Sequence, residues 1–189
     1  RFPIEAGPVR LRGNLLTFGT VSPGHIKAEY TEIYNTSHDT IRPTWSDVPK
    51  YLRITAAQEG VPPGEQGTYS LVFAPTAGTP YGIVTDSLTL NIPGSDPVKV
   101  EFVAIVEEDF SKYTEQQLAD APKIVVEPSK VDFGQFSTSE GPITRNFTVT
   151  NQGKNPLLLR RIYTTEKGFT VKAKFDKLKK GKSGQVTVT

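Results

Sequence analysis

The chain of 189 residues contains one sequence pattern twice, and the two copies lie 115 to 117 residues apart. The matching segments are residues 16–19 (Leu-Thr-Phe-Gly) with 131–134 (Val-Asp-Phe-Gly), 33–35 (Ile-Tyr-Asn) with 149–151 (Val-Thr-Asn), and 63–67 (Pro-Gly-Glu-Gln-Gly) with 180–184 (Lys-Gly-Lys-Ser-Gly). A drift of two residues over the three matches is typical of duplicated β-domains whose loops differ in length. The pattern therefore predicts a tandem of two related domains.

Apolar and polar residues alternate over several short stretches, whereas helical periodicity is nearly absent. Residues 69–73, 88–92 and 98–106 alternate in this way, and clusters rich in Pro and Gly such as 62–64 and 93–97 separate them. About seven such strands in a hundred residues are typical of an immunoglobulin-like sandwich. The predicted fold class is all-β, with tandem immunoglobulin-like antiparallel β-sandwiches. In the repeated Phe-Gly pair, the ring is predicted to anchor the first strand in the core and the glycine to permit a bulge.

The repeat also sets the expected domain boundaries. Residues 1–8 are predicted to be the tail of a preceding segment, 9–108 the first sandwich, 109–122 a linker with a short helix, and 123–189 the second sandwich. Because Thr189 aligns with Val72, the second sandwich is expected to be incomplete at its C-terminus, without its last strands. We expect a longer parent chain to supply these strands, with donation by another chain as the alternative.

The linker contains the one helical signal of the chain. Thr114 and Gln117 have the spacing of a capping box, and Pro122 prevents the helix from continuing. The sequence predicts one or two helical turns here. The apolar residues Phe110, Tyr113 and Leu118 could pack against either domain and stiffen the tandem.

Composition excludes several kinds of chemistry. With 36% hydrophobic and 22% charged residues the chain is an ordinary soluble globular protein, and no apolar run reaches the ~18 residues of a membrane span. It has no Cys, two His and no phosphate-binding glycine motif, which excludes thiol chemistry and speaks against a catalytic triad. We therefore expect no enzyme activity, catalytic residue, cofactor or metal site.

The net charge of +2 hides a difference between the two copies. Residues 9–108 carry seven Lys and Arg against eleven Asp and Glu, whereas residues 123–189 carry thirteen against five, which gives −4 and +8. The basic candidates for binding an anionic partner are Arg160, Arg161, Lys179, Lys180 and Lys182. The alternative is a solvated face. Nucleic acid is not expected as a partner, because no recognition motif accompanies the charge.

Two aromatic residues are candidates for binding a sugar. Trp45, with Tyr51 nearby in the sequence, could form a platform on which a sugar ring stacks. The alternative is an inter-strand or core tryptophan, which is common in sandwiches.

The order of the motifs resembles a known family. The Phe-Gly of the first strand, a second strand ending in Asn-x-Ser (35–37) or Asn-x-Gly (151–153), the Pro-Gly-x-x-Gly turn and a Glu-Asp-Phe-Ser connector ending in Ala-Pro (108–122) resemble tandem immunoglobulin-like domains of an uncharacterised family of secreted Bacteroidetes proteins. That family is related to hydin-type (ASH) and major-sperm-protein-like domains. The chain lacks the Cys-Gly-Cys of many members and has Thr44-Trp45-Ser46 in that region.

This resemblance implies a periplasmic or cell-surface location and no known catalytic activity. It also implies O-glycosylation sites at Thr40 and Ser87, because Asp39-Thr40-Ile41 and Asp86-Ser87-Leu88 are similar to acceptor sites of exported Bacteroidetes proteins. The predicted function is a non-catalytic structural or interaction module that binds a protein or a surface glycan. The alternatives are a carbohydrate-binding or adhesive module and, for a eukaryotic source, a cytoplasmic ciliary-type scaffold.

Overall fold

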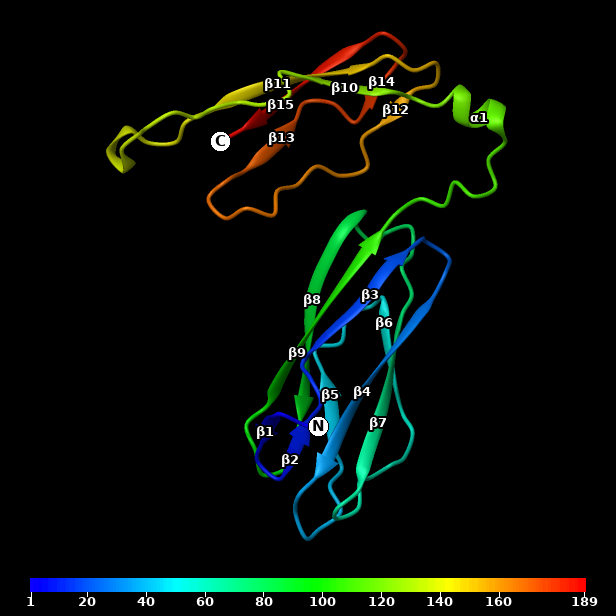
Figure 1. Cartoon of the computed structure of the whole chain (residues 1–189), viewed down its shortest axis with the longest axis vertical. Helices are drawn as coiled ribbons and strands as arrows, with labels where there is room; N and C mark the ends of the chain where they lie inside the picture. The colour runs from blue at the N-terminus through cyan, green and yellow to red at the C-terminus, as the bar shows by residue number, and fades with distance from the viewer. The chain divides into compact units, whose positions relative to one another are not determined.

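The computed structural model describes all residues from 1 to 189 and divides into two compact units, Arg1–Asp109 and Phe110–Thr189 (Figure 1). Strands dominate both units. The helical elements are α1 (Glu115–Ala119) and the 3-10 turn η1 (Thr138–Glu140). The prediction of an all-β fold is confirmed.

The first unit is a sandwich of two sheets. One sheet has the strand order β1 (Ile4–Ala6), β2 (Val9–Leu11), β4 (Lys27–Asn35), β7 (Gln66–Phe73), β6 (Leu52–Ala56). The other has the order β3 (Leu15–Val21), β9 (Val98–Val106), β8 (Gly82–Asn91), β5 (Thr44–Ser46). All neighbouring pairs are antiparallel except β3 and β9, which are parallel.

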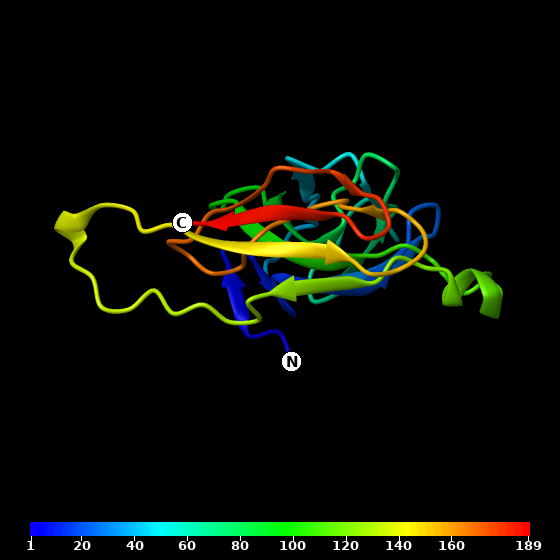
Figure 2. The same cartoon turned by 90° about the horizontal axis from the view of Figure 1, so that it is seen from above.

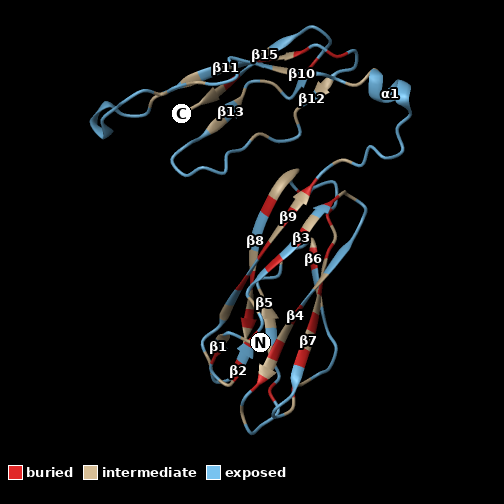
Figure 3. Ribbon diagram, in the orientation of Figure 1, coloured by how far each residue is buried: buried red, intermediate tan, exposed pale blue.

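The core of the first unit lies between the inward faces of its sheets. Phe18, Phe73 and Phe102 are at most 1% exposed, and their ring centroids lie 5.4 to 6.1 Å apart. Burying each of these rings is worth about 2–3 kcal/mol. Figure 3 shows buried residues along the strands of this unit. The prediction that Phe18 anchors the first strand is confirmed.

The bulge predicted beside Phe18 is also present. The register of β3 against β9 shifts between Thr17 and Gly19, and Gly19 has a φ of 65°. A side chain is strained in this left-handed conformation, so the glycine allows the strand to bulge and continue.

The second unit repeats only part of this plan. Its main sheet has the order β10 (Ile124–Glu127), β11 (Arg145–Asn151), β15 (Ser183–Val188), β13 (Val171–Ala173), and β12 (Leu157–Leu158) pairs with β14 (Lys177–Leu178). Figure 2 shows β10, β11 and β15 side by side, in yellow-green, yellow and red. The repeat offset matches the main sheet to the first sheet of unit 1, and it matches the β12–β14 pair to the Ile41–Val61 bridge of unit 1. Residues 110–189 contain no counterpart of β8 or β9, and the counterpart of β3, residues 131–134, forms no strand.

A buried asparagine holds the same turn in both units. The Asn35 side-chain amide donates to the carbonyls of Asp39 and Val61, and Asn151 donates to those of Asn155 and Leu178, at 2.7 to 3.0 Å. Both side chains are 0% exposed. The repeated asparagine is therefore a structural residue that fastens the end of β4 or β11 to the following loop.

The ends of the expected segments differ in detail from the structure. Residues 1–8, predicted to be the tail of a preceding segment, include β1, which pairs with β2 and joins the first sheet. The reason is a tight turn at Gly7, whose φ of 54° reverses the chain. In the predicted linker the helix is α1, and the capping box of Thr114 with Gln117 is confirmed.

Candidate functional site

Trp45 packs into the first unit as a half-buried inter-strand residue. It lies on β5, opposite Leu90 of β8, and its ring meets the edge of Tyr69 at a centroid distance of 5.4 Å. Its indole nitrogen is buried without a hydrogen-bond partner. This packing corresponds to the core alternative, because a stacking platform needs an open ring face.

Tyr51 takes part in a different set of contacts. Its ring lies edge-on to Phe73 and Phe102, and its hydroxyl donates to Asp86 Oδ2 at 2.6 Å. Burial and then this hydrogen bond raise the pKa of Tyr51 above its ordinary range. Trp45 and Tyr51 thus pack on different partners, and the structure does not join them into one platform.

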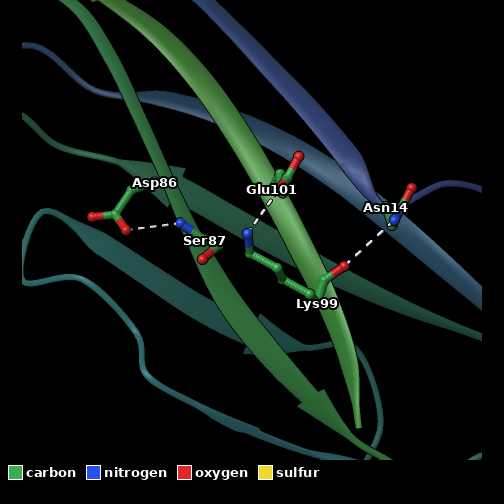
Figure 4. Close-up of polar contacts among 5 residues, drawn as sticks. All are labelled: Asn14, Asp86, Ser87, Lys99 and Glu101. Atoms are coloured by element: carbon green, nitrogen blue, oxygen red, sulfur yellow. Dashed lines mark hydrogen bonds and ion pairs between the residues drawn. The ribbon is translucent and has the colours of Figure 1, made fainter. Parts of the chain in front are cut away.

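The two predicted O-glycosylation positions differ in accessibility. Thr40 is exposed in the loop after β4, whereas Ser87 is half-buried in the middle of β8 and pairs with Glu101 of β9. Figure 4 shows the polar contacts around Ser87: Asp86 Oδ1 accepts from the Ser87 backbone nitrogen at 2.8 Å, and Lys99 pairs with Glu101 at 2.8 Å. Asn14 also donates to the Lys99 carbonyl at 3.5 Å. Thr40 is therefore the more accessible of the two hydroxyls.

The basic candidates of the second unit fall into two groups. Arg160 and Arg161 follow β12, and the Arg161 guanidinium lies 4.3 Å from the centre of the Tyr163 ring. Lys179, Lys180 and Lys182 occupy the turn between β14 and β15. Because β12 and β14 are antiparallel, Arg160 follows one end of this two-stranded pair and Lys179 follows the opposite end. All five residues are exposed, but the strand register separates them into two groups.

The largest departure between the two units is an open apolar face on the second. Val9 and Leu11 of β2 are 0% exposed, whereas Ile124 and Val126, their counterparts on β10, are 55% and 40% exposed. Val126 pairs directly with the buried Val149, so these side chains lie on the inward face of the sheet. In the first unit this face is covered by the sheet that contains β8 and β9.

We define the open face as Ile124, Val126 and the neighbouring inward side chains Phe147, Val171 and Val188, which are half-buried. Sequence reasoning named none of them as functional. The signal that identifies them is the repeat itself, because an offset of 115 residues places Ile124 and Val126 on two fully buried positions of the first unit.

Two classes of site are not observed. No group of three or more His, Cys, Asp or Glu side chains is placed to hold a metal ion. No helix of the structure is both long and apolar enough to cross a membrane.

Comparison with known proteins agrees with the fold and leaves the activity open. Residues 124–189 match the family DUF1573, described as a protein of unknown function. No curated protein matches the chain. A protein of unknown function from Porphyromonas gingivalis W83 has a similar structure, with a TM-score of 0.67 and 17% identity over 96% of this chain and 82% of that one.

Weaker likenesses extend to two further solved structures. PapD-like domain 7 of human CEP192 has a TM-score of 0.43 and 13% identity, covering 57% of this chain and 92% of that one. The CupB2 chaperone of Pseudomonas aeruginosa has a TM-score of 0.39 and 10% identity, covering 93% and 87%. At these identities the comparisons concern the fold.

Proposed function

We propose that this chain is a non-catalytic interaction module of an exported bacterial protein, and that the open face of the second unit is covered by a further polypeptide segment, which either the continuing chain or a partner supplies. The observation that carries the proposal is the exposure of Ile124 and Val126, at 55% and 40%, on the inward face of a sheet. The same positions in the first unit are fully buried.

The physical argument rests on the apolar character of this face. Fully burying one Ile or Val side chain contributes about 1.5–3 kcal/mol. Because about half of each of the two side chains is exposed, covering Ile124 and Val126 together contributes about 2 kcal/mol. Contiguous exposed apolar surface of this kind marks interaction sites in soluble proteins. A polypeptide segment suits the face better than a small molecule, because the face is a sheet surface that a second layer of strands covers in the first unit.

Export and the tandem family assignment rest on the sequence resemblance. They predict an export signal in the natural reading frame and a periplasmic or surface location. Sequencing the source gene and fractionating cells that carry a tagged protein test both points. A cytoplasmic protein without a leader would contradict export while leaving the interaction module intact.

Site-specific photo-crosslinking tests the interaction. A photoreactive phenylalanine derivative replaces Ile124 in one form of the chain and Ile26, an exposed apolar residue of the first unit, in the control form. Envelope extract of the source bacterium supplies the partners. We expect crosslinks from position 124 to one defined polypeptide segment, in the same chain or in a partner, and no such crosslinks from position 26. Equal labelling at both positions, or none at 124, would contradict a specific face.

A further inference from the structure

We propose that the second unit docks on an anionic lipid surface through one basic end, where the turn that begins at Asn151 gathers lysines from three segments of the chain. We define the basic end as Lys123, Lys154, Lys179, Lys180 and Lys182. This surface is separate from the open face, so the inference goes beyond the proposed function and does not depend on it.

Backbone hydrogen bonds around Asn151 bring the three segments together. The Asn151 nitrogen donates to the Lys182 carbonyl at 3.0 Å, and the nitrogen of Gln152 donates to the Lys123 carbonyl at 2.8 Å. Gly153 permits this approach, because a Cβ at this position would overlap the backbone nitrogen of Lys123. The start of β10, the turn after β11 and the turn between β14 and β15 therefore meet at one end of the unit.

The first unit builds the same arrangement without a lysine. There the Asn35 nitrogen donates to the Glu65 carbonyl at 3.0 Å, and the Thr36 nitrogen donates to the Pro8 carbonyl at 2.9 Å. The positions equivalent to the five lysines are occupied by Pro8, His38, Pro62, Pro63 and Glu65. The fold does not need positive charge at these positions, and like charges gathered there repel one another. An anionic partner accounts for charge that the fold itself does not require.

Most of this charge is unpaired within the chain. Lys154 pairs with Asp120 at 2.7 Å, whereas the other four lysines of the basic end form no ion pair in the structure. All five lysines are exposed. The basic end is therefore electrostatically complementary to a surface that carries several negative charges.

Exposed apolar side chains lie beside the basic end. Leu118 of α1 is 51% exposed, and Phe110 and Tyr113, which precede the helix, are 51% and 50% exposed. The end of α1 is fixed to the turn, because the Asn155 nitrogen donates to the Asp120 carbonyl at 3.0 Å. Figure 1 and Figure 2 both show α1 at the end of the second unit where β11 ends and β15 begins.

The combination of lysines and apolar side chains favours a lipid surface over other anions. At an anionic bilayer, each nearby lysine strengthens binding by about fivefold, and apolar side chains enter the boundary between headgroups and acyl chains. A free phosphate contacts few lysines at once, and exposed ion pairs with a protein contribute little. An acidic polysaccharide would neutralise the lysines but leave the apolar side chains in water.

Vesicle co-sedimentation of the full chain tests the proposal. Vesicles of phosphatidylcholine are compared with vesicles that also contain phosphatidylglycerol, at low and at physiological ionic strength. We expect the anionic vesicles to bind the chain at least about tenfold more tightly. We also expect this binding to weaken at the higher ionic strength, because salt screens the exposed charges.

Two triple variants with the same loss of charge locate the contact. Replacing residues 179, 180 and 182 in Lys179→Gln/Lys180→Gln/Lys182→Gln should weaken binding to anionic vesicles at least about thirtyfold. The matched control Lys130→Gln/Lys167→Gln/Lys172→Gln removes three exposed lysines that lie outside the basic end, and it should weaken binding less than about threefold. Circular dichroism verifies that both variants are folded.

A single pair of variants tests the apolar part of the contact. Leu118→Gln should weaken binding about fivefold at both ionic strengths, because salt does not screen the insertion of an apolar side chain. Leu158→Gln is the matched control, since Leu158 is similarly exposed, at 47%, but lies on β12. It should bind like the unmodified chain.

Each other outcome would overturn the proposal. Equal weakening in the two triple variants would show that only net charge matters, and equal binding to both kinds of vesicle would exclude the lysines. Binding to dextran sulfate that needs the same lysines, with no effect of Leu118→Gln on vesicles, would assign the basic end to an acidic polysaccharide instead. Crosslinking at position 124 reports the open face alone, so failure of the proposed function and failure of this inference are distinguishable.

Discussion

Replacing the repeated asparagine should destabilise one unit and leave the other in place. In Asn35→Ala, four hydrogen bonds are lost: two from the amide to carbonyl oxygens at 2.7 and 2.8 Å, and two from Ser37 to Oδ1 at 2.8 and 2.7 Å. At about 1 kcal/mol each, with partial rehydration of the exposed Asp39 end, the loss is about 3 kcal/mol.

The assay exploits the single tryptophan, which lies in the first unit. Urea unfolding followed by Trp45 fluorescence reports the first unit, and circular dichroism reports both. With a slope of about 1.5 kcal/mol/M, the loss lowers the urea midpoint of Asn35→Ala by about 2 M. Asn151→Ala removes the equivalent bonds from the second unit and should leave the fluorescence midpoint unchanged.

The isosteric variant Asn35→Asp supplies a pH signature. Its carboxylate would face two carbonyl oxygens, so its folded pKa should be raised above the unfolded value of about 4. A raised folded pKa means that stability is retained below the unfolded pKa and lost as pH rises through the folded pKa. The variant should thus be more stable at pH 4 than at pH 7. A fluorescence midpoint of Asn35→Ala within about 0.5 M of the parent would refute the assignment, since the loss of one buried and three part-buried hydrogen bonds should cost more than this.

Two further predictions concern titrating groups. Tyr51→Phe removes the bond to Asp86 and should cost about 1 kcal/mol in urea unfolding. In the parent, burial raises the pKa of Tyr51 and of Tyr69, and the bond to Asp86 raises that of Tyr51 further, so two tyrosines should ionise late in an ultraviolet titration and Tyr51→Phe should remove one of them. The hydrogen bond from Lys154, joined by one from Gln116, lowers the pKa of Asp120, so its contribution is present above the unfolded pKa of about 4 and lost as pH falls through the folded value. Lys154→Met should raise this pKa in a carbon-detected NMR titration, and an unchanged value would show that the ion pair does not form in solution.

Much of the fold could be predicted because its signals are local. Alternation in residues 98–106 identifies a strand, and the Phe-Gly pair identifies an anchored bulge, since each depends on neighbouring residues. The parallel pairing of β3 with β9 could not be predicted in this way. This pairing joins residues more than eighty positions apart in the sequence. The alternation of apolar and polar residues in each strand is also the same whether the two strands pair parallel or antiparallel.

The candidate site was harder to predict because exposure depends on what covers a face. Trp45 and Tyr51 were predicted as a pair because both are aromatic and lie near each other in the sequence. In the structure they pack against different core residues, Trp45 against Tyr69 and Tyr51 against Phe73. Ile124 and Val126 have an ordinary strand pattern and gave no signal of their own.

The two copies show that burial of the repeated phenylalanine depends on strand pairing and not on the repeated motif itself. Phe18 and Phe133 occupy equivalent positions in nearly the same sequence, but Phe18 is fully buried and Phe133 is only half-buried. The difference follows from β9, which pairs with β3 and places Phe102 against Phe18, at 5.8 Å between ring centroids. Without such a strand, residues 131–134 keep the glycine conformation but form no ladder. The same Phe-Gly motif is therefore compatible with a buried and with a half-buried ring, and the pairing of a neighbouring strand decides which of the two is formed.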